Sequence, residues 1–448
     1  MFGGSRCVRA LGLLVALSAA SPRAAVAGGF AIPEIGARKT GMGAVVGRPD
    51  ELDAVYHNPA GLTLLPGTWL SISIGASLPS SDFRLRPWPG SEKFIDAPVS
   101  SDGYYPETQP TRAFGVIPFI AASTNLLSDR LWIAASLYVP NAQGGSFDPN
   151  GVTRFHLVDS YAVAGYGTLS LAWRVNDRLS IGAGLSLIYV RAYADRRLFP
   201  ILAGHDLTAF LGKNADLTLD GSGLDVGWNA GVLLWPTSSL SIGAAVIGGN
   251  HLDVKGGVTV TPSDDGFLSG NPFSGTQTTG IVIPWTLLLG ANLDVSRHVE
   301  IGAELRYWYY AEFQNQHTSV EGIDLLKSLD SPKNYDNSWQ VSGGVRVHDL
   351  PAGLELMAGM HYDRSPAPDD TVSLDSPSFN HVGLHVGARY TIRERWRLAL
   401  TYAHYWYLER STDASLTTPP SNFEASGQNN IVTLAIEVML GPGLVLKR

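Results

Sequence analysis

Three arginines lie close together in the run Val190-Arg191-Ala192-Tyr193-Ala194-Asp195-Arg196-Arg197. A guanidinium group can hold a carboxylate through two parallel hydrogen bonds. Arg191, Arg196 and Arg197 are therefore candidate ligands for an anionic head group. The same cations would also pair with neighbouring acidic side chains or with the phosphates of lipopolysaccharide, and the sequence leaves these alternatives open.

The other residue types that perform chemistry do not form a site that the sequence identifies. We find no Gly-x-Ser-x-Gly nucleophile motif, no phosphate-binding loop and no cysteine cluster, since Cys7 is the single cysteine. His404 and nearby hydroxyl groups would suit a phospholipase with its catalytic residues on the membrane-facing surface. More simply, His404 is a residue near the end of a strand. We expect no enzyme, no cofactor and no metal centre.

Residues 1–27 have the organisation of a secretory signal peptide. Arg6 and Arg9 precede a short apolar core, and Ala25-Val26-Ala27 fits a cleavage site between small residues. The core is too short to cross a bilayer as a helix. Three arginines and no acidic residue lie in this segment, so its removal changes the net charge from −8 to −11. Such a charge disfavours nucleic acid as a partner.

From Thr68 onward the chain alternates between apolar residues and small or polar ones. In the run Val299-Glu300-Ile301-Gly302-Ala303-Glu304-Leu305-Arg306, the odd positions are apolar and the even positions are glycine or charged. A strand places these two sets on opposite faces. We count 14 such segments between residues 68 and 440. A charged fraction of 16% is low for a soluble protein and fits strands with one lipid-facing side.

The connections between these segments alternate strictly between long and short. The short ones include Asn176-Asp177, Ser296-Arg297 and Arg393-Glu394-Arg395. The long ones cover about 79–111, 140–159, 195–221, 255–279, 314–336, 365–381 and 411–427. Outer-membrane barrels have short periplasmic turns and long extracellular loops. Residues 68–448 are therefore predicted to form an all-β, 14-stranded antiparallel transmembrane barrel.

Residues 28–67 do not alternate and are rich in glycine and scattered apolar residues. A barrel of 14 strands is wider than the eight-stranded type that side chains fill. We therefore expect this segment to fold inside the lumen as a hatch. A disordered periplasmic tail is the alternative, but such tails are usually richer in charge and poorer in large apolar residues.

Several motifs resemble the FadL-type outer-membrane transporters of long-chain fatty acids. They are Gly28-Gly29-Phe30, Gly41-Met42-Gly43 and Tyr56-His57-Asn58-Pro59-Ala60-Gly61, and the family has an Asn-Pro-Ala motif at this place. The hatch motif of this chain is thus Asn58, Pro59, Ala60 and Gly61. The barrel runs 173–184 and 358–369 also match the style of the family.

The resemblance implies passive uptake of hydrophobic molecules, most simply long-chain fatty acids, through a barrel whose hatch responds to the ligand. It places Gly28, Gly29 and Phe30 near the bound molecule. It also implies lateral exit through a kink in the third strand, where Val139 and Pro140 lie. Proline cannot donate a hydrogen bond to a neighbouring strand, which is consistent with an interrupted wall.

Other functions stay open at this point. Relatives of the fatty-acid carriers take up aromatic hydrocarbons, a general porin would have an open lumen, and a structural protein would bind partners through its loops. We expect the chain to be a monomer in the outer membrane of a Gram-negative bacterium, in contact with lipid and lipopolysaccharide.

Overall fold

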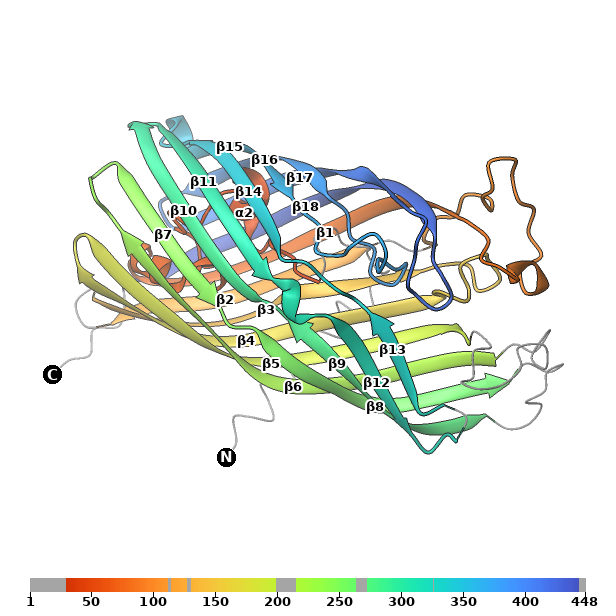
Figure 1. Cartoon of the computed structure of the whole chain (residues 1–448). Helices are drawn as coiled ribbons and strands as arrows, with labels where there is room; N and C mark the ends of the chain where they lie inside the picture. Colours follow the sequence, from red (N-terminus) through yellow and green to blue (C-terminus); the bar gives the residue numbers. More distant parts are fainter. Residues whose placement is uncertain are drawn as a thin grey trace.

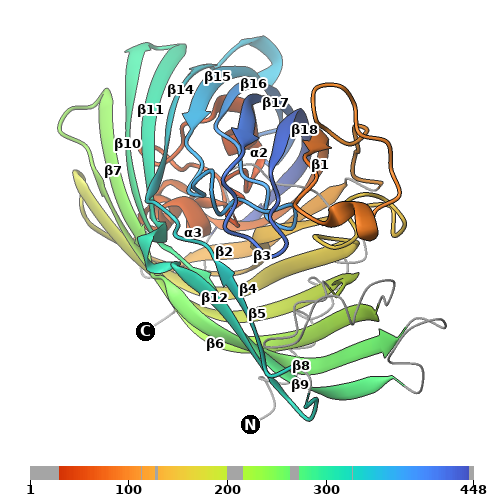
Figure 2. The ribbon, with the colours of Figure 1, turned by 45° about the vertical axis from the view of Figure 1, so that its right-hand side comes forward.

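The computed structural model describes residues 30–111, 114–126, 130–198, 215–262, 272–324 and 326–442. The predicted signal peptide, Gly28 and Gly29 lie outside these ranges. The described strands form one antiparallel sheet of 18, and β1 pairs with both β2 and β18, so the sheet closes on itself (Figures 1 and 2). In four places, one strand continues the path of another across the wall after a short break. The 18 strands therefore form 14 segments of the wall, as predicted, and we call each segment a stave.

The staves are numbered here by their strands. Ten consist of single strands: β1 (Thr68–Leu85), β2 (Gly115–Leu126), β3 (Leu131–Ser146), β4 (Asp159–Asn176), β5 (Leu179–Arg197), β6 (Ala215–Leu234), β15 (Leu354–Asp363), β16 (His381–Ile392), β17 (Trp396–Thr412) and β18 (Phe423–Gly441). Four are interrupted: β7 (Leu240–Ile247) with β8 (Asn250–Pro262), β9 (Phe273–Ile283) with β10 (Trp285–Ser296), β11 (Val299–Tyr309) with β12 (Asn315–Glu321), and β13 (Ser328–Pro332) with β14 (Ser338–Val347).

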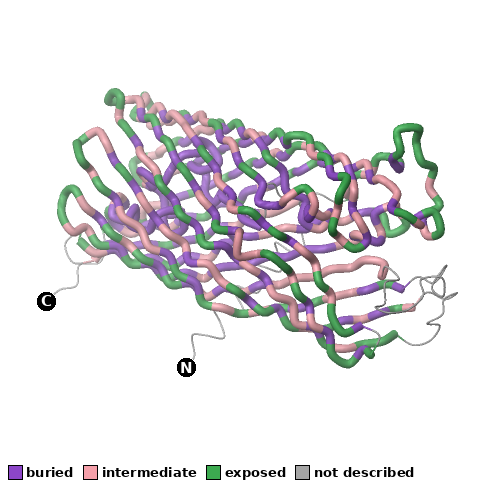
Figure 3. The backbone as a smooth tube through the Cα atoms, in the orientation of Figure 1, coloured by how far each residue is buried: buried purple, intermediate pink, exposed green. Residues whose placement is uncertain are grey.

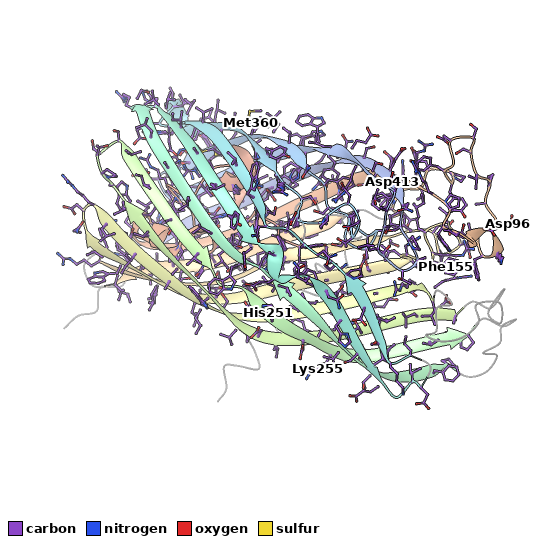
Figure 4. The ribbon with its side chains drawn as sticks, viewed as in Figure 1. Asp96, Phe155, His251, Lys255, Met360 and Asp413 are labelled. Atoms are coloured by element: carbon purple, nitrogen blue, oxygen red, sulfur yellow. The ribbon has the colours of Figure 1, made fainter. Side chains whose placement is uncertain are left out.

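The predicted alternation sets the two faces of the wall. Along β11, Ile301 and Leu305 are exposed on the outside while Glu300, Glu304 and Arg306 are buried on the inside. Met360 projects from the outer surface of β15 and is 58% exposed (Figure 4). Figure 3 shows the buried residues gathered in the interior of the barrel. The apolar face is thus turned to lipid, because backbone pairing within a closed sheet leaves only side chains to meet the membrane.

The predicted short turns are confirmed, but the strands extend into most of the predicted long loops, and two of these loops consist largely of strand. Residues 255–279 contain the end of β8 and the start of β9, and residues 314–336 contain β12 and β13 (Figure 1). These hairpins extend beyond the lipid-facing band at the long-loop end. Lipid no longer imposes an apolar face there, so the sequence alternates less clearly although the strands still pair. Shorter helical turns lie in the connections: η2 (Ser91–Lys93), η4 (Tyr310–Glu312) and η5 (Pro351–Gly353).

The segment before the barrel lies inside the ring of strands (Figure 2). It contains α2 (Ala37–Met42), α3 (Ala54–His57) and the 3-10 helix η1 (Pro59–Leu64), and its side chains are nearly all buried. Helix α2 packs against β14 to β18, and η1 packs against β3 to β6. Among the described residues, no helix combines the length and the apolar character needed to cross a membrane.

Candidate functional site

A large cavity lies above the N-terminal segment, on the side of the long loops. The space that the centre of a water molecule can occupy in it is about 210 Å3. Its wall is mostly apolar or aromatic, with Phe30, Ile281 and Tyr310 among the lining residues. Loop residues such as Leu374 and Pro419 reach into it from the connections after β15 and β17. A concave site that combines apolar surface with polar side chains is the usual form of a small-molecule site.

Two cations and one half-buried acid line one part of this cavity: Arg196 at the end of β5, Lys333 after β13, and Asp375 in the loop before β16. Burial would raise the pKa of Asp375, but Lys333, a hydrogen bond from Ser373 and Arg196 together hold the pKa below its usual value. Asp375 is therefore ionised at neutral pH and interacts with both cations. Lys333 is only 2% exposed.

The structure separates the three predicted arginines. Arg196 faces inward and lines the cavity, whereas Arg191 and Arg197 lie on the opposite face of β5. Arg191 is paired with Asp220 at 3.3 Å and Arg197 with Asp216 at 3.6 Å. Neither arginine is among the residues that line the cavity. Successive side chains of a strand point to opposite faces, so the odd positions 191 and 197 share one face and the even position 196 lies on the other.

Phe30, the first described residue, lies at the base of the cavity. Its backbone N–H donates to the hydroxyl of Tyr310 at 3.2 Å, and its carbonyl accepts from the N–H of Ala142 at 3.2 Å. Ile32 donates to the carbonyl of Pro140 at 2.7 Å. The N-terminal residues are therefore held as a short added strand against β3.

Strand β3 is irregular where the sequence places Val139 and Pro140. Its register with β4 shifts between Tyr138 and Asn141, which is the mark of a bulge. Its pairing with β2 ends at Tyr138, opposite Phe119. Beyond that point, within the described part of the chain, the edge of β3 that faces β2 pairs with the N-terminal residues instead.

The body of the N-terminal segment is fixed to the wall by buried ion pairs at the end with short turns. Glu300 of β11 is fully buried and contacts the guanidinium groups of Arg38, Arg48 and Arg346. Arg38 also pairs with Asp50, so one cluster ties two parts of the segment to two strands. A second buried carboxylate, Glu304, accepts from Lys39 at 2.9 Å and from the backbone N–H of Val45 at 2.7 Å. The N–H of Val45 lies outside the short helices of the segment and has no hydrogen-bond acceptor within them.

The motif around Asn58 fits closely against glycines of the wall. The Asn58 side-chain amide donates to the carbonyl of Val232 at 3.0 Å, and its oxygen accepts from the N–H of Ala60 at 3.2 Å, which caps η1. A Cβ atom at Gly231 would lie 2.1 Å from the Asn58 Oδ1, and a Cβ at Gly182 would lie 2.4 Å from the Pro59 carbonyl carbon. The motif is therefore a contact surface between segment and barrel.

Three inward-facing histidines lie close together, and two of them have the spacing His-x-x-x-His. His381 and His385 are four residues apart on β16 and face inward with His361 of β15. The Nδ1 of His361 lies 2.6 Å from the Nε2 of His385, whose Nδ1 bonds to the carbonyl of Thr40 at 2.9 Å. This chain of contacts links the wall to α2. His404 faces outward, and its Nδ1 lies 2.9 Å from the Oδ1 of Asn430.

One group of potential metal ligands brings Asp294, Glu300 and His348 within 4.8 Å of one another. Arg48 pairs with both Asp294 and Glu300, at 2.6 Å and 3.0 Å. The carboxylates are thus already neutralised by a cation that belongs to the protein, and we assign this group to the anchoring of the N-terminal segment.

Arg196 and Phe30 were proposed from the sequence and line this cavity, whereas Lys333 and Asp375 line it without a prediction from the sequence. Both lie in long connections, at 314–336 and 365–381, where no alternation indicates which way a side chain points. Each connection carries several charged residues, and the sequence does not indicate which of them line the cavity. Only the folding of these connections back over the barrel brings them together.

Comparisons with known proteins give one consistent result. Residues 17–439 match the family described as outer membrane protein transport protein (OMPP1/FadL/TodX). Outer membrane protein P1 of Haemophilus influenzae is 23% identical over 61% of this chain, and the match spans 64% of the Haemophilus protein. The long-chain fatty acid transport protein of Escherichia coli is 23% identical over 58% of this chain and 68% of its own length.

Solved structures share the fold. A FadL homologue of Pseudomonas aeruginosa superposes with a TM-score of 0.79 at 18% identity, covering 92% of this chain and 99% of that one. The toluene transporter TodX of Pseudomonas putida gives a TM-score of 0.71 at 16% identity, covering 91% and 99%. Together with the family match over nearly the whole chain, this similarity confirms the predicted fold, resemblance and cellular location: the chain belongs to the OMPP1/FadL/TodX family of outer-membrane transport proteins.

Proposed function

We propose that this protein takes up hydrophobic molecules with an acidic head group, such as long-chain fatty acids, from outside the cell. The observation that carries the proposal is the cavity itself, which joins an apolar wall to the cations Arg196 and Lys333. The apolar wall would accommodate an alkyl chain, since burial of each methylene group contributes about 0.8 kcal/mol. The cations would hold the carboxylate.

Asp375 would make the site respond differently to acidic and to neutral ligands. It already interacts with both cations, so a ligand carboxylate has to compete with it. A neutral ligand would leave the three charges as they are. The affinity for an acid therefore depends on the balance between the ligand and Asp375, and the affinity for a neutral molecule does not.

We further propose that residues 28–67 form a hatch of which only the first residues move. The backbone groups of residues 30–32 are held to β3 and Tyr310 by a few hydrogen bonds, which include one from the side-chain amide of Asn141, and each contributes about 1 kcal/mol. The segment from Arg38 to Asn58 is held by buried ion pairs, whose disruption is far more costly. A ligand that displaces Phe30 from the base of the cavity would thus free the N-terminal residues and leave the ion-paired body in place.

Displacement of these residues would open the wall beside β3. Beyond Tyr138, residues 30–32 occupy the edge of β3 that β2 leaves unpaired. Their release would leave a lateral opening at Val139 and Pro140 that leads to the lipid. The route needs no energy source, because an apolar molecule gains free energy when it enters the membrane.

Binding of oleate and of oleyl alcohol to the purified full-length protein tests the head-group proposal. We expect Arg196→Gln and Lys333→Gln each to raise the Kd for oleate about tenfold, which corresponds to about 1.4 kcal/mol. The Kd for oleyl alcohol should not change. Arg191→Gln is the matched control, since Arg191 faces outward and is paired with Asp220. Equal losses for acid and alcohol would contradict a carboxylate site.

A neutral aromatic hydrocarbon is the second candidate, because the similar structures include a toluene transporter. Tyr310 and Tyr335 line the cavity and pack edge to face at 5.9 Å. If toluene binds with micromolar affinity and oleate does not, this second candidate replaces the first.

A further inference from the structure

Asp375, the acid of the large cavity, lies in a short turn of the connection before β16. Within this turn, the N–H of Ser376 donates to the carbonyl of Ser373 at 3.2 Å, and the Ser373 hydroxyl donates to the Asp375 carboxylate. Residues 373–376 therefore form one compact unit. A movement of Asp375 away from the cations is passed on to Ser376, its neighbour in the chain.

The chain on either side of this turn is held in place. The carbonyl of Val372 accepts from the hydroxyl of Ser421 at 3.3 Å, and the carbonyl of Ser378 accepts from the guanidinium group of Arg410. Residues 373–376 thus lie between two anchored positions. A movement that starts at Asp375 is therefore concentrated in this turn.

The hydroxyl of Ser376 bonds to two other parts of the protein. It donates to the side-chain oxygen of Gln143 on β3 at 3.2 Å, and it lies 3.2 Å from the hydroxyl of Tyr335. A serine hydroxyl has a single hydrogen to donate, so Tyr335 is the donor in the second bond. Ser376 is only 7% exposed, and a buried polar group that loses its partners is destabilising.

Tyr335 connects Ser376 with the N–H of Phe30. The ring of Tyr335 packs edge to face against that of Tyr310 at 5.9 Å, and the Tyr310 hydroxyl accepts from the Phe30 N–H at 3.2 Å. Both tyrosines are buried. Because protein interiors are closely packed, a shift of one ring displaces the other.

Gln143 connects Ser376 with the carbonyl of Phe30. It lies on the same face of β3 as Asn141, whose side-chain amide donates to this carbonyl at 3.4 Å. The N–H of Ala142, between these two residues, donates to the same carbonyl at 3.2 Å. Both backbone polar groups of Phe30 are therefore held by residues that adjoin the two partners of Ser376.

An acidic ligand changes the forces on Asp375. In the free protein, Asp375 is ionised and is attracted by Arg196 and Lys333. A carboxylate that binds these cations weakens their attraction for Asp375, and it also repels Asp375 because like charges at short range oppose each other. A neutral ligand does neither. An acid therefore drives the turn away from the cations, whereas a neutral molecule leaves it in place.

We propose that Ser376 is a positioning residue that couples the head-group site at Arg196 and Lys333 to the hatch. When a carboxylate binds to the cations, residues 373–376 move and Ser376 leaves its two partners. The hold of those partners on Phe30 then weakens. The inference rests on the proposed function, and it adds a second way to release the first residues besides direct displacement of Phe30 by the alkyl chain.

Hydrogen exchange of the purified full-length protein tests the coupling. Exchange is followed in peptides that cover residues 30–32 and 140–143, whose amides form bonds between the N-terminal residues and β3. The free protein is compared with the protein saturated with oleate and with oleyl alcohol. We expect oleate to speed this exchange several-fold more than oleyl alcohol does, because only oleate opens these bonds through Ser376.

Ser376→Ala removes the coupling. Its exchange without ligand should already lie near the level of the native protein with oleate, and oleate should add a further change of about twofold at most. Tyr335→Phe removes one of the two bonds and keeps the ring against Tyr310, so it should give an intermediate result. Ser378→Ala is the matched control, since the buried Ser378 hydroxyl bonds to Ser365 at 2.8 Å in the same connection. Normal heat-modifiable mobility on gels verifies that each barrel has assembled.

The affinity for oleate distinguishes coupling from a purely structural role. If part of the binding energy of oleate is used to release Phe30, removal of the coupling leaves the Kd for oleate unchanged or lowers it. A serine that only supports the site would show the opposite sign. A Kd several-fold higher in Ser376→Ala than in the native protein would therefore overturn the coupling.

The two proposals fail in distinguishable ways. If oleate and oleyl alcohol speed exchange equally in the native protein, or if Ser376→Ala responds to oleate as Ser378→Ala does, the coupling is wrong. The proposed function stands in that case, provided that Arg196→Gln still weakens the binding of oleate. If the native protein does not bind oleate, the proposed function itself is wrong.

Discussion

The Nη2 of Arg306, on the barrel wall, donates a hydrogen bond to the Nδ1 of His57 in the N-terminal segment across 2.6 Å. The other ring nitrogen of His57 lies 2.7 Å from the carbonyl of Ile35 and donates to it. This arrangement requires the neutral imidazole. A proton on Nδ1 would abolish the hydrogen bond from Arg306, and the charged ring would be repelled by Arg306 and Lys39. Burial, followed by the charge of Arg306, lowers the pKa of His57 well below 6.5.

The first prediction concerns pH. When the segment is undocked, His57 takes up a proton near pH 6.5, whereas the docked form resists protonation. Its contribution to docking is therefore present above about pH 6.5 and is lost as the pH falls toward the depressed pKa, with a slope of up to ~1.4 kcal/mol per pH unit. Hydrogen exchange of residues 36–58 at pH 7.0 and 5.5, corrected for intrinsic rates, measures this change.

His57→Gln isolates the effect, because other groups act in the opposite direction. Burial raises the pKa of Glu34 and of Asp53, so these carboxyls favour docking as the pH falls. The difference in pH slope between the native protein and His57→Gln is thus the quantity to compare. Identical slopes would show that His57 does not report on docking.

The second prediction concerns the anchor of the hatch. Glu300→Gln keeps the size of the side chain but leaves Arg38, which is 1% exposed, without its buried carboxylate partner. We expect the docked state of the segment to lose about 3–5 kcal/mol, the usual result of breaking a buried pair. The readout is protease cleavage between residues 38 and 58 in the assembled barrel. Glu424→Gln, at a partly exposed pair with Arg84 outside the N-terminal segment, should leave cleavage unchanged.

The third prediction concerns the fit of the Asn-Pro-Ala motif. Asn58→Ala removes the cap of η1 and the bond to Val232, which should weaken docking by about 1–2 kcal/mol. Gly231→Ala should have an equal or larger effect, because its Cβ would lie 2.1 Å from the Asn58 Oδ1. Gly280→Ala is the control, since nothing lies within 4 Å of a Cβ there. A native exchange pattern in Gly231→Ala would contradict the close fit.

The fourth prediction concerns the acid in the large cavity. Asp375→Asn removes the charge that competes for Arg196 and Lys333, so we expect oleate to bind several-fold more tightly. Oleyl alcohol should bind as before. Equilibrium binding at pH 7.5, where Asp375 is ionised, distinguishes the two ligands, and Asp369→Asn in the same loop serves as the control because Asp369 is 72% exposed. Weaker oleate binding by Asp375→Asn would show that this residue supports the ligand and does not compete with it.

Much of the barrel could be predicted because its rule is local. A residue in a strand has one of two faces, so the pattern of β11 or β17 gives the inside and the outside from neighbouring residues alone. The same parity rule, applied at position 196 against positions 191 and 197, would have separated the three arginines without any structure. The alternating lengths of the connections then fixed the number of staves.

The paths of the long connections were not predictable in this way. At the ends of β8, β9, β12 and β13 both faces lie outside the lipid, and the alternation weakens although the pairing continues. Gly248, Gly249 and Pro284 mark possible breaks in the sequence. That these breaks fall side by side depends on the stagger of the strands.

The sequence by itself determined an outer-membrane barrel of 14 staves, a glycine-rich segment before it, and which face each strand residue occupies, since all of these follow from local periodicity and composition. The tertiary structure alone decided that Glu300 meets Arg38, and that Lys333 and Asp375 join Arg196. These contacts join residues far apart in the chain, and they form only when the sheet has closed and its connections and the first segment have packed within it.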